Sequence, residues 1–215
     1  MKRRAPGSSW LLLAASAACA PAAGKPLGPP EGSFEVSDYF APSGAMGDGE
    51  MAENLIIDDA SNCKPRPAGA AGHCYHFEYH AGALLWSGVY FQYPANNWGA
   101  QPGLAIPPSL ERLSFQAAIV GEPDVITFVA GGIGIPAPAQ GAQPFVDPFR
   151  AQLDVTLTTE YQRVEIPIAL PTSGTAEGPR LIGALGWFMN HRAGSDPSTA
   201  PIKTLYLDDL VYEAE

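Results

Sequence analysis

The chain has 215 residues, of which 46% are hydrophobic and 16% charged, a composition that suits one folded domain. Its 23 glycines and 22 prolines interrupt the sequence too often for a helical bundle and favour short strands joined by turns. The formal net charge of −10 argues against binding to nucleic acid or to anionic lipid, because both carry negative charge.

The N-terminal segment, residues 1–19, is typical of an export signal. A basic start precedes an apolar stretch over residues 10–13, and small residues then lead to Cys19. The apolar stretch is shorter than the roughly 20 residues that span a bilayer. Residues 16–19 resemble the bacterial lipobox, whose cysteine is lipidated, although Ser16 stands where leucine is usual. We therefore expect an exported protein whose only membrane attachment is a lipid on Cys19, at the outer membrane or cell surface. Without lipidation it would be periplasmic or secreted.

Residues 20–32 are rich in Pro, Gly and Ala and predict an extended tether before a domain over residues 33–215. The chain has three cysteines, so lipidation of Cys19 would leave Cys63 and Cys74 as a pair. These two flank a Pro/Gly/Ala-rich loop, and in an oxidising compartment we expect them to form a disulfide.

From residue 33 onward, apolar and polar residues alternate in short runs, and no window shows sustained helical periodicity. Strands are predicted over residues 33–40, 54–59, 73–80, 86–93, 110–119, 124–130, 149–158, 161–168, 181–189 and 203–213. About ten short strands in a domain of this size indicate an all-β fold, a two-sheet antiparallel β-sandwich of the jelly-roll type.

The runs over residues 73–80 and 86–93 are predicted to pair as an antiparallel hairpin through the loop at residues 81–85. In that pairing one face is mostly apolar and suits the core: Tyr75, Phe77, Tyr79, Ser87, Val89 and Phe91. The opposite face combines aromatic and polar side chains: His76, Glu78, His80, Trp86, Tyr90 and Gln92. Exposed aromatic surface costs about 25 cal/mol per Å² in water, so we expect a ligand to cover this face.

The following loop, residues 92–103, places aromatic rings and amides between prolines and glycines. Sugars present apolar C–H faces and rings of hydroxyl groups, so their sites need an aromatic surface flanked by amide and carboxylate groups. The candidate ligand-binding residues are Trp86, Tyr90, Gln92, Tyr93, Asn96, Asn97, Trp98, Trp187, His76 and Glu78. Alternatively, Trp98 and Trp187 pack in the interior, and Asn96 and Asn97 only form a turn.

The C-terminal run TLYLDDLVYE, residues 204–213, resembles the closing strand of galactose-binding-like jelly-roll carbohydrate-binding modules from bacterial glycan-degrading systems. As an architecture the resemblance extends over residues 33–215. It implies noncatalytic glycan binding and a structural calcium ion that joins the first and last strands, with no other cofactor. The candidate calcium ligands are Asp209 or Asp208 on the last strand and Asp38, Asp48 or Glu50 near the first.

Motifs for enzyme chemistry are weak. His76, Glu78 and His80 alternate on one strand face, but these positions span roughly 13 Å and cannot all bind one zinc ion. The acids available for glycoside hydrolysis form no tight cluster: Asp147, Asp154, Glu160 and Glu165. No Gly-x-Ser-x-Gly motif occurs.

The sequence therefore indicates an exported, lipid-anchored, single-domain protein that binds a polysaccharide or oligosaccharide without catalysis. Two alternatives remain open at this point. One is a structural or protein-interaction lipoprotein whose aromatic face docks a partner, and the other is a glycan-active hydrolase or lyase. The sequence leaves the sugar and the oligomeric state open.

Overall fold

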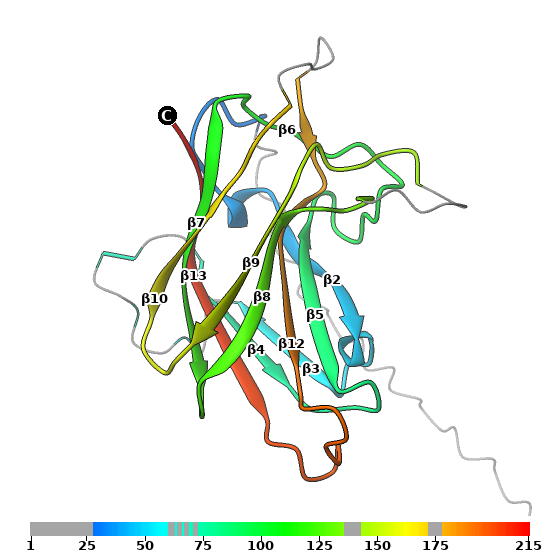
Figure 1. Ribbon diagram of the computed structural model, residues 1–215. Helices are drawn as coiled ribbons and strands as arrows, with labels where there is room; N and C mark the ends of the chain where they lie inside the picture. Colours follow the sequence, from blue (N-terminus) through cyan, green and yellow to red (C-terminus); the bar gives the residue numbers. More distant parts are fainter. Residues whose placement is uncertain are drawn as a thin grey trace, which may run out of the picture.

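The computed structural model describes residues 28–59, 63, 66, 69–70, 73–135, 143–171 and 178–215. These residues form two large antiparallel sheets and one two-stranded ribbon (Figure 1). Within these ranges the only helical segments are two single 3-10 turns, η1 (Val36–Asp38) and η2 (Asp48–Glu50). The expected all-β sandwich is confirmed. The predicted export signal and Cys19 lie outside the described residues.

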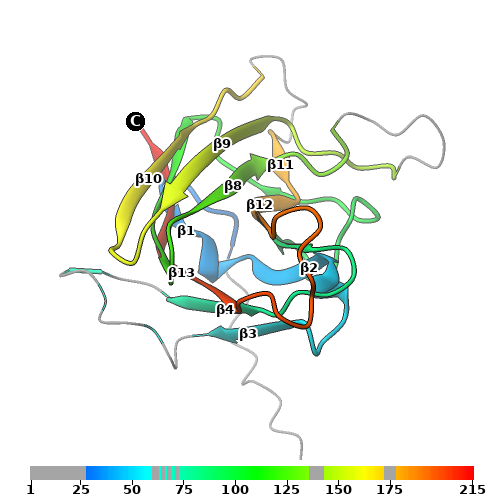
Figure 2. The ribbon, with the colours of Figure 1, turned by 60° about the horizontal axis from the view of Figure 1, so that its bottom comes forward.

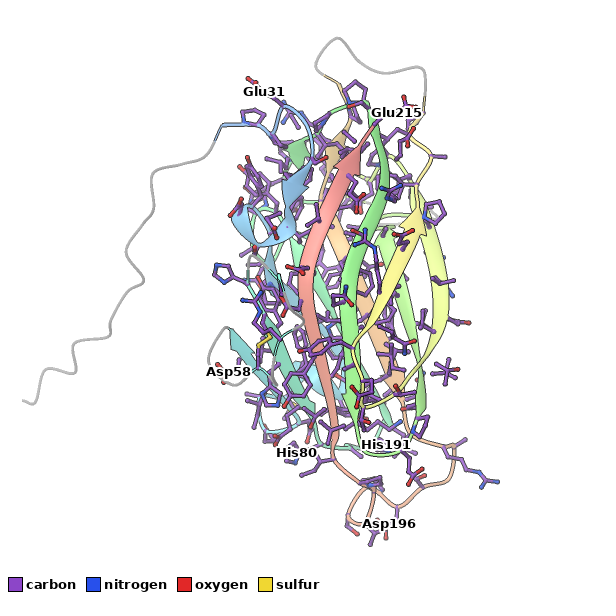
Figure 3. The ribbon with its side chains drawn as sticks, turned by 90° about the vertical axis from the view of Figure 1, so that its left-hand side faces the viewer. Glu31, Asp58, His80, His191, Asp196 and Glu215 are labelled. Carbon is purple, nitrogen blue, oxygen red and sulfur yellow. A yellow bond between two sulfur atoms is a disulfide. The ribbon has the colours of Figure 1, made fainter. Side chains whose placement is uncertain are left out.

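Sheet A contains the last strand at its centre. Its strands are β1 (Phe34–Glu35), β3 (Leu55–Asp59), β4 (Tyr75–Tyr79), β7 (Leu110–Val120), β10 (Gln162–Pro167) and β13 (Lys203–Ala214). The order is β10-β7-β13-β4-β3, and β1 pairs with β13. Figure 3 shows β13 and β7 side by side, with Glu215 toward one end of the sheet and His80 toward the other.

Sheet B has the order β2-β5-β12-β8-β9 (Figure 1). Its strands are β2 (Ala41–Gly47), β5 (Trp86–Gln92), β8 (Asp124–Gly131), β9 (Arg150–Leu157) and β12 (Gly183–Asn190). Strand β2 was not predicted, because its sequence APSGAMG contains turn-forming residues and no alternation. It lies at the edge of the sheet, where a proline is tolerated. Strands β6 (Leu104–Ala105) and β11 (Arg180–Leu181) form the separate ribbon.

The hydrophobic core fills the space between the two sheets. Tyr75 and Phe77 of β4 and Phe91 of β5 all point into it and are at most 2% exposed. The ring centroids of Tyr75 and Phe91 lie 4.8 Å apart, in an edge-to-face arrangement. Strands β4 and β5 therefore face each other across the sandwich, and the inward positions predicted for these two strands are confirmed.

The predicted hairpin between these strands is wrong. Strand β4 pairs with β3 and β13, whereas β5 pairs with β2 and β12. Figure 2 shows β4 beside β3 in one layer, with β2 and β12 in the other. The chain over residues 80–85 thus crosses from one sheet to the other. The same residues of β4 and β5 are buried whether the two strands pair in a hairpin or face each other across the sandwich. In the sandwich, however, their outward residues lie on opposite surfaces of the molecule.

The expected disulfide between Cys63 and Cys74 is present, with the two Cα atoms 6.2 Å apart. Cys74 directly precedes β4, so the bond attaches the loop to the start of a central core strand. Closing a loop of this length stabilises the folded state by about 2–3 kcal/mol on the chain-entropy model.

Candidate functional site

A line of four aromatic side chains lies on the outer face of sheet B. Trp86 and Tyr90 point outward from β5, Phe188 points outward from β12, and Trp98 comes from the loop that follows β5. Successive ring centroids are 5.9 Å apart for Trp98 and Tyr90, 6.0 Å for Tyr90 and Phe188, and 6.4 Å for Phe188 and Trp86. We call these four residues the aromatic platform.

Glycines on neighbouring strands let two of these rings lie against the sheet. A Cβ atom at Gly186 would lie 2.7 Å from Cζ of Tyr90, and one at Gly88 would lie 2.8 Å from Cδ1 of Phe188. Both glycines are cross-strand neighbours of an aromatic residue, Gly186 of Tyr90 and Gly88 of Phe188. An aromatic ring packed over a glycine is a known stabilising device in sheets. Here the glycines also keep the rings of Tyr90 and Phe188 close to the sheet, where Tyr90 meets Trp98 and Phe188 edge to face, at interplanar angles of 81° and 82°.

The platform is open to solvent at some positions and covered at others. Trp98 is 40% exposed, Trp86 and Phe188 are half-buried, and Tyr90 is 7% exposed. Tyr90 packs with Ile133 in a small apolar cluster on this outer face. Burial raises the pKa of Tyr90 to about 12, so its hydroxyl group is neutral at physiological pH and is able to donate a hydrogen bond.

Polar side chains run alongside the platform on β8 and β9. Arg150, Gln152 and Asp154 occupy successive outward positions of β9 and are all exposed. Arg150 Nη2 donates to Gln152 Oε1 at 2.8 Å, and Thr127 Oγ1 of β8 donates to Asp154 Oδ1 at 2.7 Å. The face therefore offers flat apolar rings bordered by hydrogen-bonding groups of both kinds.

The loop that carries Trp98 is organised by the buried side chain of Asn97. Its amide nitrogen donates to the carbonyls of Tyr93 (3.1 Å) and Gln101 (2.9 Å). Its Oδ1 accepts from the backbone N–H groups of Gly99 (3.0 Å) and Gln101 (3.1 Å). These four bonds use the hydrogen-bonding capacity of the side chain, so Asn97 holds the loop and leaves no group for a ligand.

Asp147 anchors the loops at the end of the face near Tyr90. Its buried carboxylate accepts hydrogen bonds from the backbone N–H groups of Ile133 (2.8 Å) and Ile182 (2.6 Å). Burial raises the pKa of Asp147 to about 7, against the opposing effect of these N–H donors. At 2% exposed, it is a structural acid that fixes Ile133 over the platform.

Three of the predicted ligand-binding residues, Trp86, Tyr90 and Trp98, come together on the platform. Asn96 is exposed on the same loop as Trp98, with φ of 61°, and its N–H donates to Ser43 Oγ at 2.8 Å. The side chains of these residues are the part of the sequence-based site that the structure assembles.

Four of the predicted residues pack in the interior or hold a loop, three of them buried and Tyr93 partly buried, which corrects their assignment as ligand contacts. Trp187 is 0% exposed and packs against Phe77, with ring centroids 4.9 Å apart. Gln92 is 0% exposed, and its side-chain amide bonds to Ser43 Oγ and to the carbonyl of Asn97. Asn97 holds its loop through the four hydrogen bonds of its side chain. Tyr93 packs against the core, beside Phe40.

His76 and Glu78 lie on the outer face of sheet A, on the opposite side of the sandwich from the platform. His76 stacks on Tyr206 of β13, with ring centroids 5.1 Å apart. Glu78 Oε1 contacts His80 Nε2 at 2.7 Å. Their assignment to the aromatic face is therefore wrong, because it depended on the hairpin.

Sequence reasoning missed Phe188, the supporting glycines and the polar residues of β9. Phe188 follows Trp187 directly, and neighbouring strand residues point to opposite faces, so only one of the two can reach the surface. The choice between them requires the pairing of β12 with β5, which is separated from it by about half the chain. The alternation of Arg150, Gln152 and Asp154 was a usable signal for one polar face of β9.

The acids predicted to bind calcium are in two places. Asp48 is buried and accepts hydrogen bonds from Tyr79 Oη and from the backbone N–H of Leu84, both at 2.8 Å. Burial raises the pKa of Asp48, but these hydrogen bonds outweigh it and lower the pKa below its ordinary value. The carboxylate thus already has protein donors on both oxygens.

The other candidates lie near β1 and β13. Burial, followed by the carboxylates of Asp209 and Asp38, raises the pKa of Glu35, so these acids are neighbours. Asp208 is fully buried and ion-paired with Arg66, with 2.6 Å between Nε and Oδ2. Within the described ranges, no three His, Cys, Asp or Glu side chains lie close enough to hold a metal ion. Calcium binding stays a prediction.

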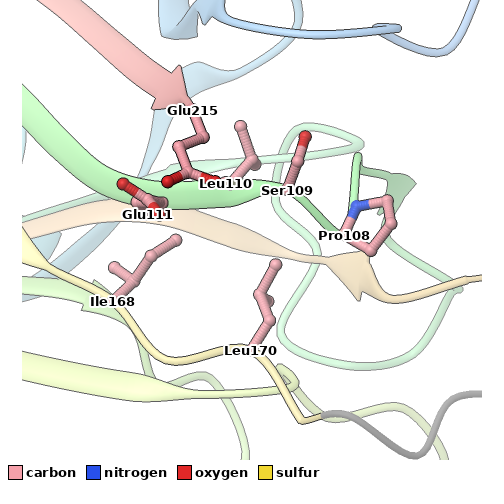
Figure 4. Close-up of a pocket in the computed structure, with 7 residues that line it drawn as sticks. All are labelled: Pro108, Ser109, Leu110, Glu111, Ile168, Leu170 and Glu215. Atoms are coloured by element: carbon pink, nitrogen blue, oxygen red, sulfur yellow. The ribbon is translucent and has the colours of Figure 1, made fainter.

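A pocket of about 520 Å³ lies at the end of sheet A that carries Glu215 (Figure 4). Leu110, Ile168 and Leu170 line it together with Glu111 and Glu215. Its lining has apolar side chains and two carboxylates but no aromatic ring on which a sugar could stack. The platform is therefore the better candidate for a sugar-binding site.

No protein-family model matches the chain, and no curated protein matches its sequence. Several solved structures are similar to it. They include the family 30 carbohydrate-binding module of a cellulosomal cellulase from Clostridium thermocellum, at 17% identity and a TM-score of 0.48, covering 85% of this chain and 98% of that one. Another is a family 11 carbohydrate-binding module from Clostridium thermocellum in complex with a β-1,3-1,4-mixed-linked tetrasaccharide, at 15% identity and a TM-score of 0.39, covering 81% and 98%. A third is the CBM22-1 xylan-binding domain of Xyn10C from Paenibacillus barcinonensis, at 10% identity and a TM-score of 0.41, covering 85% and 94%. At these identities the likeness concerns the fold.

Proposed function

We propose that this protein binds a polysaccharide or oligosaccharide noncatalytically on the outer face of sheet B. The observation that carries the proposal is the aromatic platform, four neighbouring rings bordered by Thr127, Gln152 and Asp154. Sugar rings stack on flat aromatic surfaces through their C–H faces, and their hydroxyl groups need both donors and acceptors at the border. The platform supplies both.

Binding without hydrolysis fits the charges on this face. Glycoside hydrolysis requires two carboxyl groups about 5–10 Å apart across the bond that is cleaved. The outward positions of the five described strands of sheet B hold one carboxylate, Asp154, and that group accepts a hydrogen bond from Thr127. The face is therefore suited to holding a glycan chain, and its strands do not carry the pair of carboxyl groups that glycoside hydrolysis requires.

We further propose that the domain acts outside the cytoplasm. The support is the disulfide between Cys63 and Cys74, since disulfides persist in oxidising compartments. The lipid anchor on Cys19 is a separate prediction from the export signal.

Replacing Trp98 by alanine is expected to weaken glycan binding by about 30-fold, the effect of losing an interaction worth about 2 kcal/mol from the most exposed ring of the platform. Because Trp98 is 40% exposed, the fold should be unaffected. Affinity electrophoresis through gels that contain a panel of polysaccharides measures the effect. A matched control is Ile56→Ala, which removes a side chain that is 48% exposed on sheet A.

The proposal predicts retardation of the parent protein and of Ile56→Ala by at least one polysaccharide, and little retardation of Trp98→Ala. If no polysaccharide retards the parent protein, or if Trp98→Ala migrates like the parent, the proposal is wrong. Crosslinking that captured one protein and no sugar would favour the alternative of a protein-docking face.

A further inference from the structure

Arg150 places a positive charge beside the aromatic platform. It is the first residue of β9, is exposed, and lies across from Gly131 of β8. Its stem passes over Gly132, where an added Cβ would lie 3.1 Å from Arg150 Cγ and 3.3 Å from Tyr90 Oη. Arg150 and the Tyr90 hydroxyl therefore border the same point, beside the platform.

The charge on Arg150 has no carboxylate partner among the described residues. Its side chain donates a hydrogen bond to the neutral amide oxygen of Gln152, at 2.8 Å. Four other basic side chains are ion-paired: Arg66 with Asp208, Arg112 and Arg163 with Glu213, and Lys203 with Asp124. The nearest acid on the same strand face, Asp154, is four residues away, which is about 13 Å at strand rise. That separation exceeds the screening length of about 10 Å at 0.1 M salt.

We infer that the platform takes a glycan with anionic sugars, and that Arg150 pairs with the anionic group while the platform rings contact the sugar faces. The inference rests on the proposed function and adds the ligand class. A guanidinium group is planar and presents two parallel N–H donors, which match the oxygens of a carboxylate or of a sulfate ester. The neighbouring Tyr90 hydroxyl is neutral at physiological pH and supplies a further donor at that point.

The net negative charge of the protein disfavours unspecific binding of anionic glycans. At a formal net charge of −10, the protein as a whole repels polyanions, so they would not bind it by unspecific ion exchange. Binding of an acidic glycan requires a local cation on the binding surface. Arg150 is the cation that the described part of this face provides next to the rings.

Matched pairs of polysaccharides test the inference. Polygalacturonate is compared with its fully methyl-esterified form, which has the same backbone without carboxylates, and a sulfated carrageenan is compared with its desulfated form. We expect the parent protein to bind at least one anionic form about tenfold more tightly than its neutral counterpart. The carboxylate arm and the sulfate arm show which anion is recognised.

The variant Arg150→Gln removes the charge, and Arg163→Gln is the control, since Arg163 is an exposed arginine on sheet A. Arg150→Gln should lose the roughly tenfold preference for the anionic form over its neutral counterpart, whereas Arg163→Gln should keep that preference. Equal binding of charged and neutral forms by the parent, with Trp98→Ala still defective, would overturn this inference and leave the proposed function standing. Failure to bind any of the four polysaccharides or the neutral panel would overturn both.

Discussion

Trp187→Ala is expected to lower the free energy of unfolding by about 3–5 kcal/mol, the usual cost of removing a large aromatic side chain from a core. Trp187 is the largest of the fully buried side chains and lies between the sheets against Phe77. Neighbouring strands constrain β12 on both sides, since it pairs with β5 and β8, so the cavity cannot close by a simple shift. Urea denaturation measures the change.

The conservative variant Trp187→Phe serves as the control for this prediction. The indole Nε1 has no hydrogen-bond partner among the described residues, so phenylalanine loses packing volume but no polar contact. We therefore expect a markedly smaller loss of stability for Trp187→Phe than for Trp187→Ala. A Trp187→Ala protein that is as stable as the parent but fails to bind glycan would show that Trp187 is a ligand contact after all.

Gly186→Val is expected to reduce glycan binding by about 100-fold or more, equivalent to about 2.7 kcal/mol. A Cβ atom at this position would lie 2.7 Å from Cζ and 2.8 Å from Cε1 of Tyr90, and valine adds two methyl groups to it. The ring must then leave its place against the sheet. Because Tyr90 touches both Trp98 and Phe188, its movement disrupts the centre of the platform. Isothermal titration calorimetry with an oligosaccharide that the parent protein binds measures the loss of affinity.

A control for this substitution is Gly32→Val, at a position where an added Cβ meets nothing within 4 Å. It should bind like the parent protein. Circular dichroism of Gly186→Val should still show a cooperative thermal transition, because the side chain points away from the core between the sheets. Parent-like binding by a folded Gly186→Val would contradict the role given to Tyr90.

Most of the strands and their inward faces could be predicted from local sequence, because alternation and turn residues act over a few positions. Strand β2 was missed, and of the strand predicted over residues 33–40 only Phe34–Glu35 is extended, because a 3-10 turn follows it. Tyr75, Phe77 and Phe91 were placed in the core correctly although their strands were paired wrongly. A strand with one buried face shows the same period whether its partner lies beside it or in the opposite sheet. The five residues between the two runs allow a hairpin, and the sequence holds no signal for the crossing that occurs instead.

The site was predicted only in part, because it depends on contacts between distant segments. Trp86, Tyr90 and Trp98 lie within one stretch of the chain and were identified together. Phe188 and Arg150 join them through the pairing of β5 with β12 and of β8 with β9. Asn97 was identified as polar and close to the rings, but its four internal hydrogen bonds could not be anticipated from residue type.

The most direct test of glycan binding on the outer face of sheet B is an NMR titration. The folded protein is titrated with an oligosaccharide that it binds, and the indole N–H signals of its tryptophans are followed in the ¹H–¹⁵N spectrum. Binding on the outer face of sheet B predicts shifts for Trp86 and Trp98, both partly exposed, and an unchanged signal for Trp187 in the core. Shifts confined to residues of sheet A, with the signals of Trp86 and Trp98 unmoved at saturation, would contradict it.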